Sequence, residues 1–180
     1  DILALVPERP VSFDPAVLSS IEPVLSAARV DASELYQAVW ERPLDDDVKR
    51  VLADRLLEQG DPRGELINLQ FSDDPKAKKQ VKQLLDEHGR RWLGALEPVI
   101  LKTGVAFRRG FLDECHLKAK SASALEKVIG ASEWSTVRSI TEESMGYTLE
   151  PLITKLFLHP VLRSLRVLGG QCSRALFHAL

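Results

Sequence analysis

The residues with the clearest potential for chemistry are four carboxylates that flank one glycine. They are Asp54, Glu58, Asp61 and Glu65. Neighbouring carboxylates can act as a general acid and a general base, so a hydrolase that uses this acidic hairpin is one interpretation. The other interpretation is ion pairing, because Arg50 and Arg55 precede the first two carboxylates at near-helical spacing.

Cys115 and His116 form a second candidate, because an adjacent thiol and imidazole can supply a nucleophile with its base, or two metal ligands. The surrounding residues predict a strand, on which neighbouring side chains point to opposite faces. Cys115 is therefore predicted to lie in the core. The sequence also lacks the motifs of serine hydrolases, phosphate-binding loops and zinc proteases. We predict no catalytic residue, no metal and no cofactor.

Two charged runs have a structural and a functional interpretation. The aspartates at 45–47 resemble part of a divalent-cation site, but carboxylates are also favoured at the start of a helix. The lysines at 76–82 could contact phosphate, but no aromatic residues are interleaved with them. We favour helix capping for the first run and a solvated helix face for the second.

Composition narrows the class of protein. The chain has 180 residues, of which 44% are hydrophobic and 28% charged, and its net charge is −2. This balance does not favour nucleic acid or an anionic membrane as a partner. No signal peptide or membrane-length apolar run is visible, and two cysteines are too few for a disulfide framework. We predict a cytoplasmic protein with reduced thiols. Because the chain begins at Asp1, we expect a fragment or a processed form.

The elements that must position these residues change in kind along the chain. Residues 1–30 predict an extended lead-in and a helix that starts near Asp14. Residues 31–103 show apolar residues at helical spacing, separated by caps and glycines. In residues 104–180, short strand-like runs alternate with short helical runs. We therefore predict three parts with these boundaries.

The last part contains a weak repeat. Its three runs align at a shift of 25 residues and are Leu112–Leu117, Val137–Glu142 and Leu162–Val167. Apolar residues occupy the first, fourth and sixth positions, except at Glu142. This pattern is typical of leucine-rich repeats, in which each strand and helix adds to a shared core. The alternative is a small α/β domain whose equal spacing is accidental.

Stacked strands would align equivalent residues in columns on the outer face. The predicted columns are Asp113–Arg138–Arg163, Glu114–Ser139–Ser164 and His116–Thr141–Arg166. Asp113 beside Arg138 would be favourable, whereas Arg138 beside Arg163 would not. Like charges on an exposed face indicate a binding surface for something acidic. The alternative is that both arginines extend into water.

The stretch around Gly60 predicts the hinge of a helical hairpin. Gly60 ends one helix, Asp61 caps the next, and Pro62 occupies its first turn. Gly64 would let the two helices pack closely.

Arg63 is expected to point back across this hinge. Asp54 or Glu58 would then be its partner. With that pairing, the whole stretch has a structural role without any substrate.

The motif Gly60-Asp61-Pro62-Arg63-Gly64-Glu65 has a recognisable context. Leu52-Ala53-Asp54 precedes it, and Ile67 and Leu69-Gln70 come after it. This region closely resembles a bacterial repeat-companion domain, a helical module that accompanies leucine-rich-repeat-like segments. The stretches 88–94 and 107–111 also resemble the segments on the C-terminal side of that domain in such proteins. The resemblance implies a repeat neighbour, in agreement with the 25-residue period, and implies no known enzyme activity.

These observations predict an α+β or α/β chain. Its helical N-terminal module is followed by a leucine-rich-repeat-like β-α solenoid with a short parallel sheet. We predict a non-enzymatic protein-interaction or scaffold module of a larger bacterial protein, and a hydrolase or a purely architectural domain as alternatives. The partner would be a protein rather than nucleic acid or a membrane. The last repeat is incomplete, so self-association through it is also expected.

Overall fold

The computed structural model describes residues 31–143 and 147–170. Predictions about residues 1–30, the second of the two cysteines (Cys172) and the incomplete last repeat after residue 170 lie outside these described residues. The chain divides into two compact units, Asp1–Asp31 and Ala32–Leu180. The fold and the sites below belong to the second unit.

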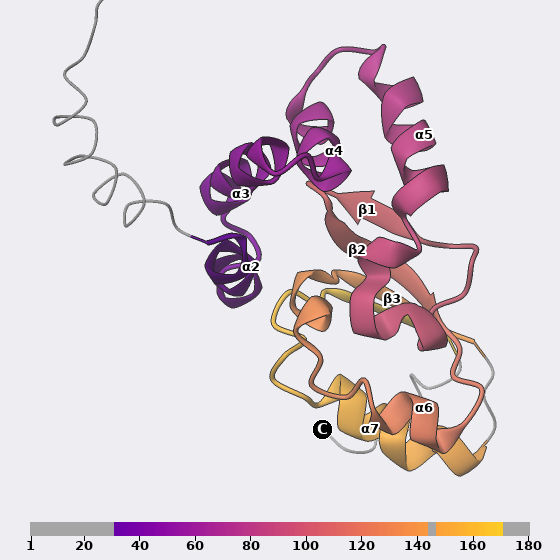
Figure 1. Cartoon of the computed structure of the whole chain (residues 1–180). Coiled ribbons are helices and arrows are strands. Elements are labelled where there is room, and N and C mark those ends of the chain that lie inside the picture. Colours follow the sequence, from indigo (N-terminus) through magenta and orange to yellow (C-terminus); the bar gives the residue numbers. More distant parts are fainter. Residues whose placement is uncertain (1–30, 144–146, 171–180) are drawn as a thin grey trace, which may run out of the picture. The chain divides into compact units, whose positions relative to one another are not determined.

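The first part of this unit is helical. Its elements are α2 (Ala32–Glu41), α3 (Asp46–Glu58), α4 (Pro62–Phe71), α5 (Ala77–His88) and the 3-10 segment η1 (Arg91–Val99) (Figure 1). Asp45 caps α3, because its carboxylate accepts hydrogen bonds from the backbone nitrogens of Asp47 and Val48, at 3.1 and 3.3 Å. The capping interpretation of the three aspartates is thus confirmed.

Helices α3 and α4 form the predicted hairpin. Gly60 has a φ of +71°, the left-handed conformation that lets a chain leave a helix. The carboxylate of Asp61 accepts a hydrogen bond of 2.8 Å from the backbone nitrogen of Arg63, and Pro62 lies in the first turn of α4. A Cβ at Gly64 would lie only 2.6 Å from the carbonyl oxygen of Ala53. The predicted close approach at Gly64 is confirmed.

The helices enclose a core that also takes in a strand residue. Its buried members are Leu35, Val39, Leu52, Ala53, Leu56, Ile67 and Phe111. Phe111 begins the longest strand, so the helical part and the sheet share this core. The change from helices to strands near residue 104 is a change of architecture within one compact unit.

The second part contains an open four-stranded sheet. Its strands are β1 (Ala106–Arg108), β2 (Phe111–Leu117), β3 (Ser139–Glu142) and β4 (Val167–Gly170), in that spatial order. Strands β1 and β2 are antiparallel, whereas β2, β3 and β4 are parallel. The described residues therefore have a mixed α+β fold that includes the predicted short parallel sheet.

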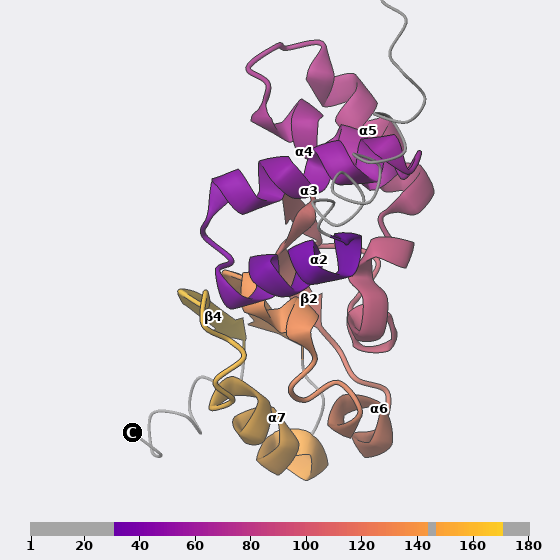
Figure 2. The same cartoon turned by 60° about the vertical axis from the view of Figure 1, so that its left-hand side comes forward.

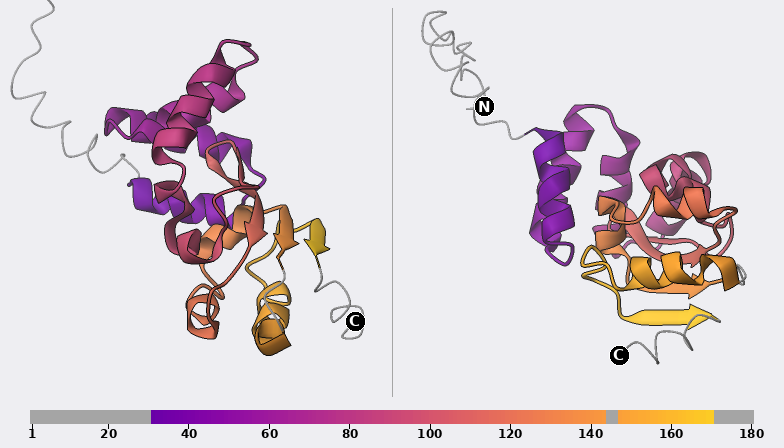
Figure 3. Two further views of the ribbon diagram at one scale, coloured as in Figure 1. Left: turned by 90° about the vertical axis from the view of Figure 1, so that its right-hand side faces the viewer. Right: turned by 90° about the horizontal axis from the view of Figure 1, so that it is seen from below.

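Short helices connect the parallel strands. They are α6 (Ala122–Glu126), η2 (Ser132–Thr136), η3 (Tyr147–Leu149) and α7 (Glu150–Phe157). Helices α6 and α7 lie on the same side of the strands (Figures 2 and 3). A second core joins them to the sheet and to η1, and it includes Leu96, Leu117, Leu125, Trp134, Ile140 and Leu156. Within the described residues, no helix is both long enough and apolar enough to cross a membrane.

The 25-residue period matches the pairing of β2 with β3 but not the pairing of β3 with β4. Glu114 pairs with Ser139 and His116 with Thr141, as a shift of 25 residues predicts. Ser139 then pairs with Val167, which is a shift of 28 residues. Of the predicted third run, Leu162–Val167, only Val167 lies in a strand. The register predicted for the third strand is therefore wrong by three residues.

The physical reason for the shifted register is that apolar residues recur every three positions within these runs. Trp134, Val137 and Ile140 are three residues apart, and so are Leu162, Leu165 and Leu168. A slip of three residues therefore places apolar residues on apolar residues in both alignments. Consecutive turns take up the three extra residues, since Leu162 and Leu165 each donate a backbone hydrogen bond to the residue three positions earlier.

A charged cleft and the strand face as candidate functional site

Arg63, the cation of the hinge motif, is directed at the turn between β1 and β2. Its Nε donates a hydrogen bond of 3.0 Å to the carbonyl oxygen of Gly110. Its guanidinium carbon lies 4.6 Å from the ring centre of Phe111 and 5.3 Å from that of Tyr36. Burial lowers the pKa of Arg63, and the neighbouring Tyr36 partly offsets that effect. Arg63 thus ties the helical hairpin to the sheet.

The predicted ion pair between Arg63 and a carboxylate of α3 is wrong. Glu58 pairs with Arg55 on its own helix, at 2.9 Å, and Asp54 is exposed. Exposed carboxylates keep their hydration in water, whereas a partly buried guanidinium is stabilised by aromatic faces and a carbonyl oxygen. Only the tertiary fold brings those groups next to Arg63.

Gln70, near the end of α4, holds the same turn by two hydrogen bonds from its side chain to backbone atoms. Its Nε2 donates to the carbonyl oxygen of Phe107 at 2.9 Å, and its Oε1 accepts from the nitrogen of Gly110 at 2.7 Å. Arg109 donates in return to the carbonyl oxygen of Gln70. A Cβ at Gly110 would lie 2.2 Å from Cγ1 of Ile67, so the turn needs glycine there.

The hinge motif therefore has a structural role at two of its three charged positions. Asp61 caps a helix and Arg63 holds the strand turn, while Glu65 is exposed beside them. Helix α4 contacts the turn at 107–111 through Arg63 and Gln70.

Asp113 and Arg138 form the predicted cross-strand pair. Nε and Nη2 of Arg138 contact the two carboxylate oxygens at 2.5 and 2.6 Å. These hydrogen bonds raise the pKa of Arg138. Asp113 is nevertheless only 7% exposed. Its prediction as an outward-facing residue is wrong, because it lies in the wall of a cleft beside the helices.

The residues predicted as the third members of the columns lie elsewhere. Nη1 of Arg163 donates to the carbonyl oxygen of Glu41 at 3.2 Å, at the end of α2, and Ser164 is buried. Arg166 stands beside Arg138 instead, since its backbone nitrogen donates to the Arg138 carbonyl oxygen at 2.9 Å. The three-residue slip accounts for all of these corrections.

The outer face of β2–β4 carries two short rows. One row is Glu114, Ser139 and Val167, and the other is His116, Thr141 and Gly169. Val167 is 57% exposed, which is unusual for a large apolar residue on a strand. Nδ1 of His116 lies 2.9 Å from a carboxylate oxygen of Glu143, so the histidine already has an acidic neighbour.

Cys115 lies on the opposite face from His116. It is buried in the core, and burial raises the pKa of its thiol to about 12. Its prediction as a core residue is confirmed. Among the described residues, no group of three or more His, Cys, Asp or Glu side chains could hold a metal ion.

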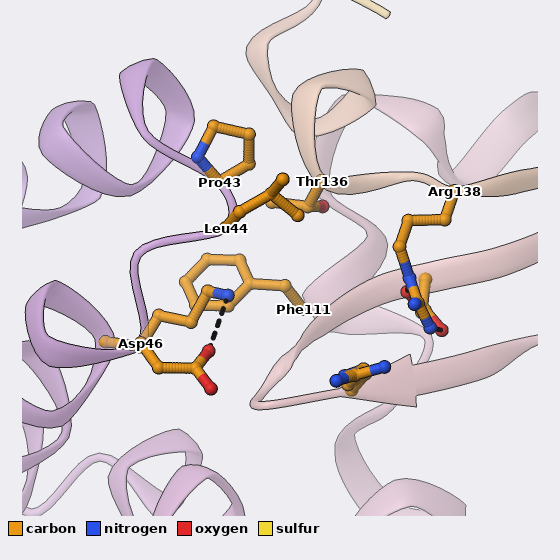
Figure 4. Close-up of a pocket in the computed structure, with 9 residues that line it drawn as sticks. Pro43, Leu44, Asp46, Phe111, Thr136 and Arg138 are labelled. Carbon is orange, nitrogen blue, oxygen red and sulfur yellow. Dashed lines mark hydrogen bonds and ion pairs between the residues drawn. The ribbon is translucent and has the colours of Figure 1, made fainter. Parts of the chain in front are cut away.

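A cleft of about 100 Å³ opens between the α2–α3 loop and the strands (Figure 4). Its lining residues are Pro43, Leu44, Asp46, Lys49, Arg108, Phe111, Asp113, Thr136 and Arg138. Asp46 and Arg138 approach it from opposite sides, with Leu44 and Phe111 between them (Figure 4). Three cations and two carboxylates leave this cleft with one excess positive charge.

Lys49 is the buried cation of the cleft. The residue is 6% exposed, and its Nζ donates a hydrogen bond of 3.2 Å to Asp46. Burial lowers the pKa of Lys49; Asp46 opposes that effect, whereas Arg108 and Arg109 add to it. Nε of Arg109 also lies 3.6 Å from Asp46, so this carboxylate is shared between two cations.

One residue of this cleft, Lys49, has a signal in the sequence. Lys49 lies three, four and seven residues before Leu52, Ala53 and Leu56, which all face the core. A lysine on the apolar face of a helix needs an anion or an opening to water. Arg108 gave no such signal, because only the fold brings it next to Lys49.

Comparison of the chain with family models, curated proteins and solved structures returns no match.

Proposed function

We propose that this chain is a non-enzymatic interaction module of a larger bacterial repeat protein that acts in the cytoplasm. Its partner is a protein with an acidic segment. That segment lies along the N-terminal ends of β2, β3 and β4 and reaches the outer strand face. A repeat-companion domain followed by a leucine-rich-repeat-like solenoid is the architecture that we propose for it.

The observation that carries this function is a concentration of arginines in a chain whose net charge is −2. Arg108 and Arg138 line the cleft, Arg166 neighbours Arg138, and Arg163 lies at the end of α2 next to the cleft loop. Among the described residues, neither Arg108 nor Arg166 takes part in an ion pair. Clustered cations with free donors attract acidic partners and orient them.

The repeat architecture draws support from the order of elements. Strand β2 is followed by α6 and β3, and β3 is followed by α7 and β4, with both strand pairs parallel. Each unit buries its apolar side against the next, as solenoid units do. The hydrolase and the purely architectural domain remain alternative predictions.

The partner class can be tested with a displayed library of random 12-residue peptides selected on the full chain. We expect enrichment of acidic peptides that shift the backbone amide resonances of β2–β4 in the labelled chain. Arg166→Glu should weaken such a peptide at least tenfold. The matched control is Lys79→Glu, the same charge reversal on the exposed side of α5, which should leave binding unchanged.

Two results would overturn the proposal. One is selection of peptides without acidic enrichment. The other is equal loss of binding in the Arg166→Glu and Lys79→Glu variants, which would indicate attraction by overall charge alone.

A further inference from the structure

We propose that the cleft is a receptor for one carboxylate of the partner's acidic segment. Lys49, Arg108 and Arg138 surround the anion, and Leu44 contacts its methylene groups. This inference rests on the proposed function, because it names the anchor point of the acidic partner.

The cleft has cationic donors that its own carboxylates leave available. Lys49 has three N–H donors, of which one is used by Asp46. Arg138 engages Asp113 through Nε and Nη2, which leaves Nη1. Arg108 is exposed, and no contact with a carboxylate engages its guanidinium in the described part of the chain. All three side chains line the same small cleft.

The charges of the cleft lining favour an anionic ligand. The two carboxylates and three cations of the lining leave a single positive charge. A single carboxylate neutralises the excess charge of the lining. A metal cation is disfavoured, because Asp46 and Asp113 are each already paired with a cation.

The apolar part of the lining explains why the anion would arrive on a side chain. Leu44 is 60% exposed and lies at the cleft together with Pro43 and Phe111. A glutamate side chain places two methylene groups behind its carboxylate, and these would cover Leu44. An isolated small anion would leave Leu44 in water.

The test uses three short peptides on the labelled full chain. Acetyl-Ala-Glu-Ala-amide carries a side-chain carboxylate, acetyl-Ala-Ala-Ala with a free C-terminus carries a terminal one, and acetyl-Ala-Gln-Ala-amide carries none. We expect the glutamate peptide to shift the Arg108 and Arg138 Nε resonances in a saturable manner. The terminal carboxylate should bind more weakly, and the glutamine peptide should leave both resonances in place.

Variants separate the cleft from general charge effects. Arg108→Gln should weaken the glutamate peptide about tenfold, the value of one charge-assisted hydrogen bond. Lys49→Met should weaken it by a similar factor. Lys79→Gln, which removes an exposed lysine of α5, is the matched control and should bind as the parent chain does. Melting curves of all variants establish that they are folded.

Each contrary result has a definite meaning. Equal binding of the glutamate and glutamine peptides overturns the inference, and so does unchanged binding in Arg108→Gln and Lys49→Met. Tighter binding of inorganic phosphate than of the glutamate peptide overturns the choice of carboxylate. If long acidic peptides bind the strand face independently of Lys49 and Arg108, the cleft inference fails and the proposed function stands. If the cleft binds the glutamate peptide but the chain has no affinity for acidic peptides, the proposed function fails and the cleft remains a carboxylate site.

Discussion

Arg63 donates a hydrogen bond from Nε to the carbonyl oxygen of Gly110, 3.0 Å away and 47 positions further along the chain. This contact joins the charged hinge of the helical hairpin to the tight turn of the β-hairpin. It replaces the local ion pair that spacing alone predicts. The hinge motif is thereby a structural link between two parts of one compact unit.

Gln70 should be a main determinant of stability. Gln70→Ala would leave the Gly110 nitrogen and the Phe107 carbonyl oxygen without their partner. We expect a loss of about 2 kcal/mol in the free energy of unfolding, measured by urea denaturation with tryptophan fluorescence. Gln80→Ala, an exposed glutamine on α5, is the control and should change stability by less than about 0.5 kcal/mol. Equal effects of the two substitutions would contradict the link.

Substitution of Gly64 by alanine should lower the free energy of unfolding, whereas the same substitution at an ordinary helical glycine raises it. Glycine to alanine inside an exposed helix stabilises by about 1 kcal/mol. At Gly64 the new Cβ would meet backbone atoms of α3 at 2.6 and 2.8 Å, so the helices must separate. We expect Gly64→Ala to destabilise by about 2 kcal/mol, while Asn68→Ala on the exposed side of α4 stays near zero. A stabilised Gly64→Ala chain would refute the close packing.

The Asp113–Arg138 pair should be strongly coupled. Arg138→Gln leaves the buried carboxylate without its cation, and we expect a loss of about 3 kcal/mol in unfolding free energy. Asp113→Asn in the same chain should recover part of that loss, because no buried charge then remains unpaired. A double-mutant cycle measures the coupling directly. Strictly additive effects would show that the pair contributes nothing beyond its separate residues.

Cys115 should be almost inert to alkylation in the native state. Burial raises the pKa of its thiol from 9.0 to about 12, so at pH 8 its thiolate fraction is lower by about a thousandfold. In a Cys172→Ser background, iodoacetamide should modify Cys115 far more slowly in native buffer than in urea. Comparable rates would contradict its burial.

The same thiol gives stability a definite dependence on pH. The unfolded chain releases the Cys115 proton near its ordinary pKa, whereas the native chain keeps it until about pH 12. The native state thus binds more protons across that window. Unfolding free energy should therefore fall with rising pH above about 9, by up to about 1.4 kcal/mol per pH unit, relative to Cys115→Ala.

Local signals in the sequence were sufficient for the hairpin and for one strand pair. Capping by Asp45 and Asp61 and the left-handed Gly60 are encoded by neighbouring residues, and so is the stop of α3. The pairing of β2 with β3 is encoded by apolar spacing, with one consistent register. In each case the residues that decide the structure lie close together in sequence or share a fixed period.

Other features depend on contacts that no local pattern encodes. The position of β4 was missed because Leu162, Leu165 and Leu168 allow two registers that bury similar surfaces. The partner of Arg63 and the meeting of Lys49 with Arg108 arise only once α3, α4 and the β-hairpin are packed. The cleft itself was therefore beyond sequence reasoning, although Lys49 on an apolar helix face was a visible sign of it.

The hydrogen bonds that hold the β1–β2 turn have a consequence for substitutions on the strand face. Gln70 and Arg63 engage main-chain atoms of Phe107 and Gly110, and those atoms are the same whatever side chains the strands carry. Side chains on the outer strand face can then be substituted without loss of these hydrogen bonds. The attachment of the helices to the strands is thus independent of the side chains that form the exposed surface.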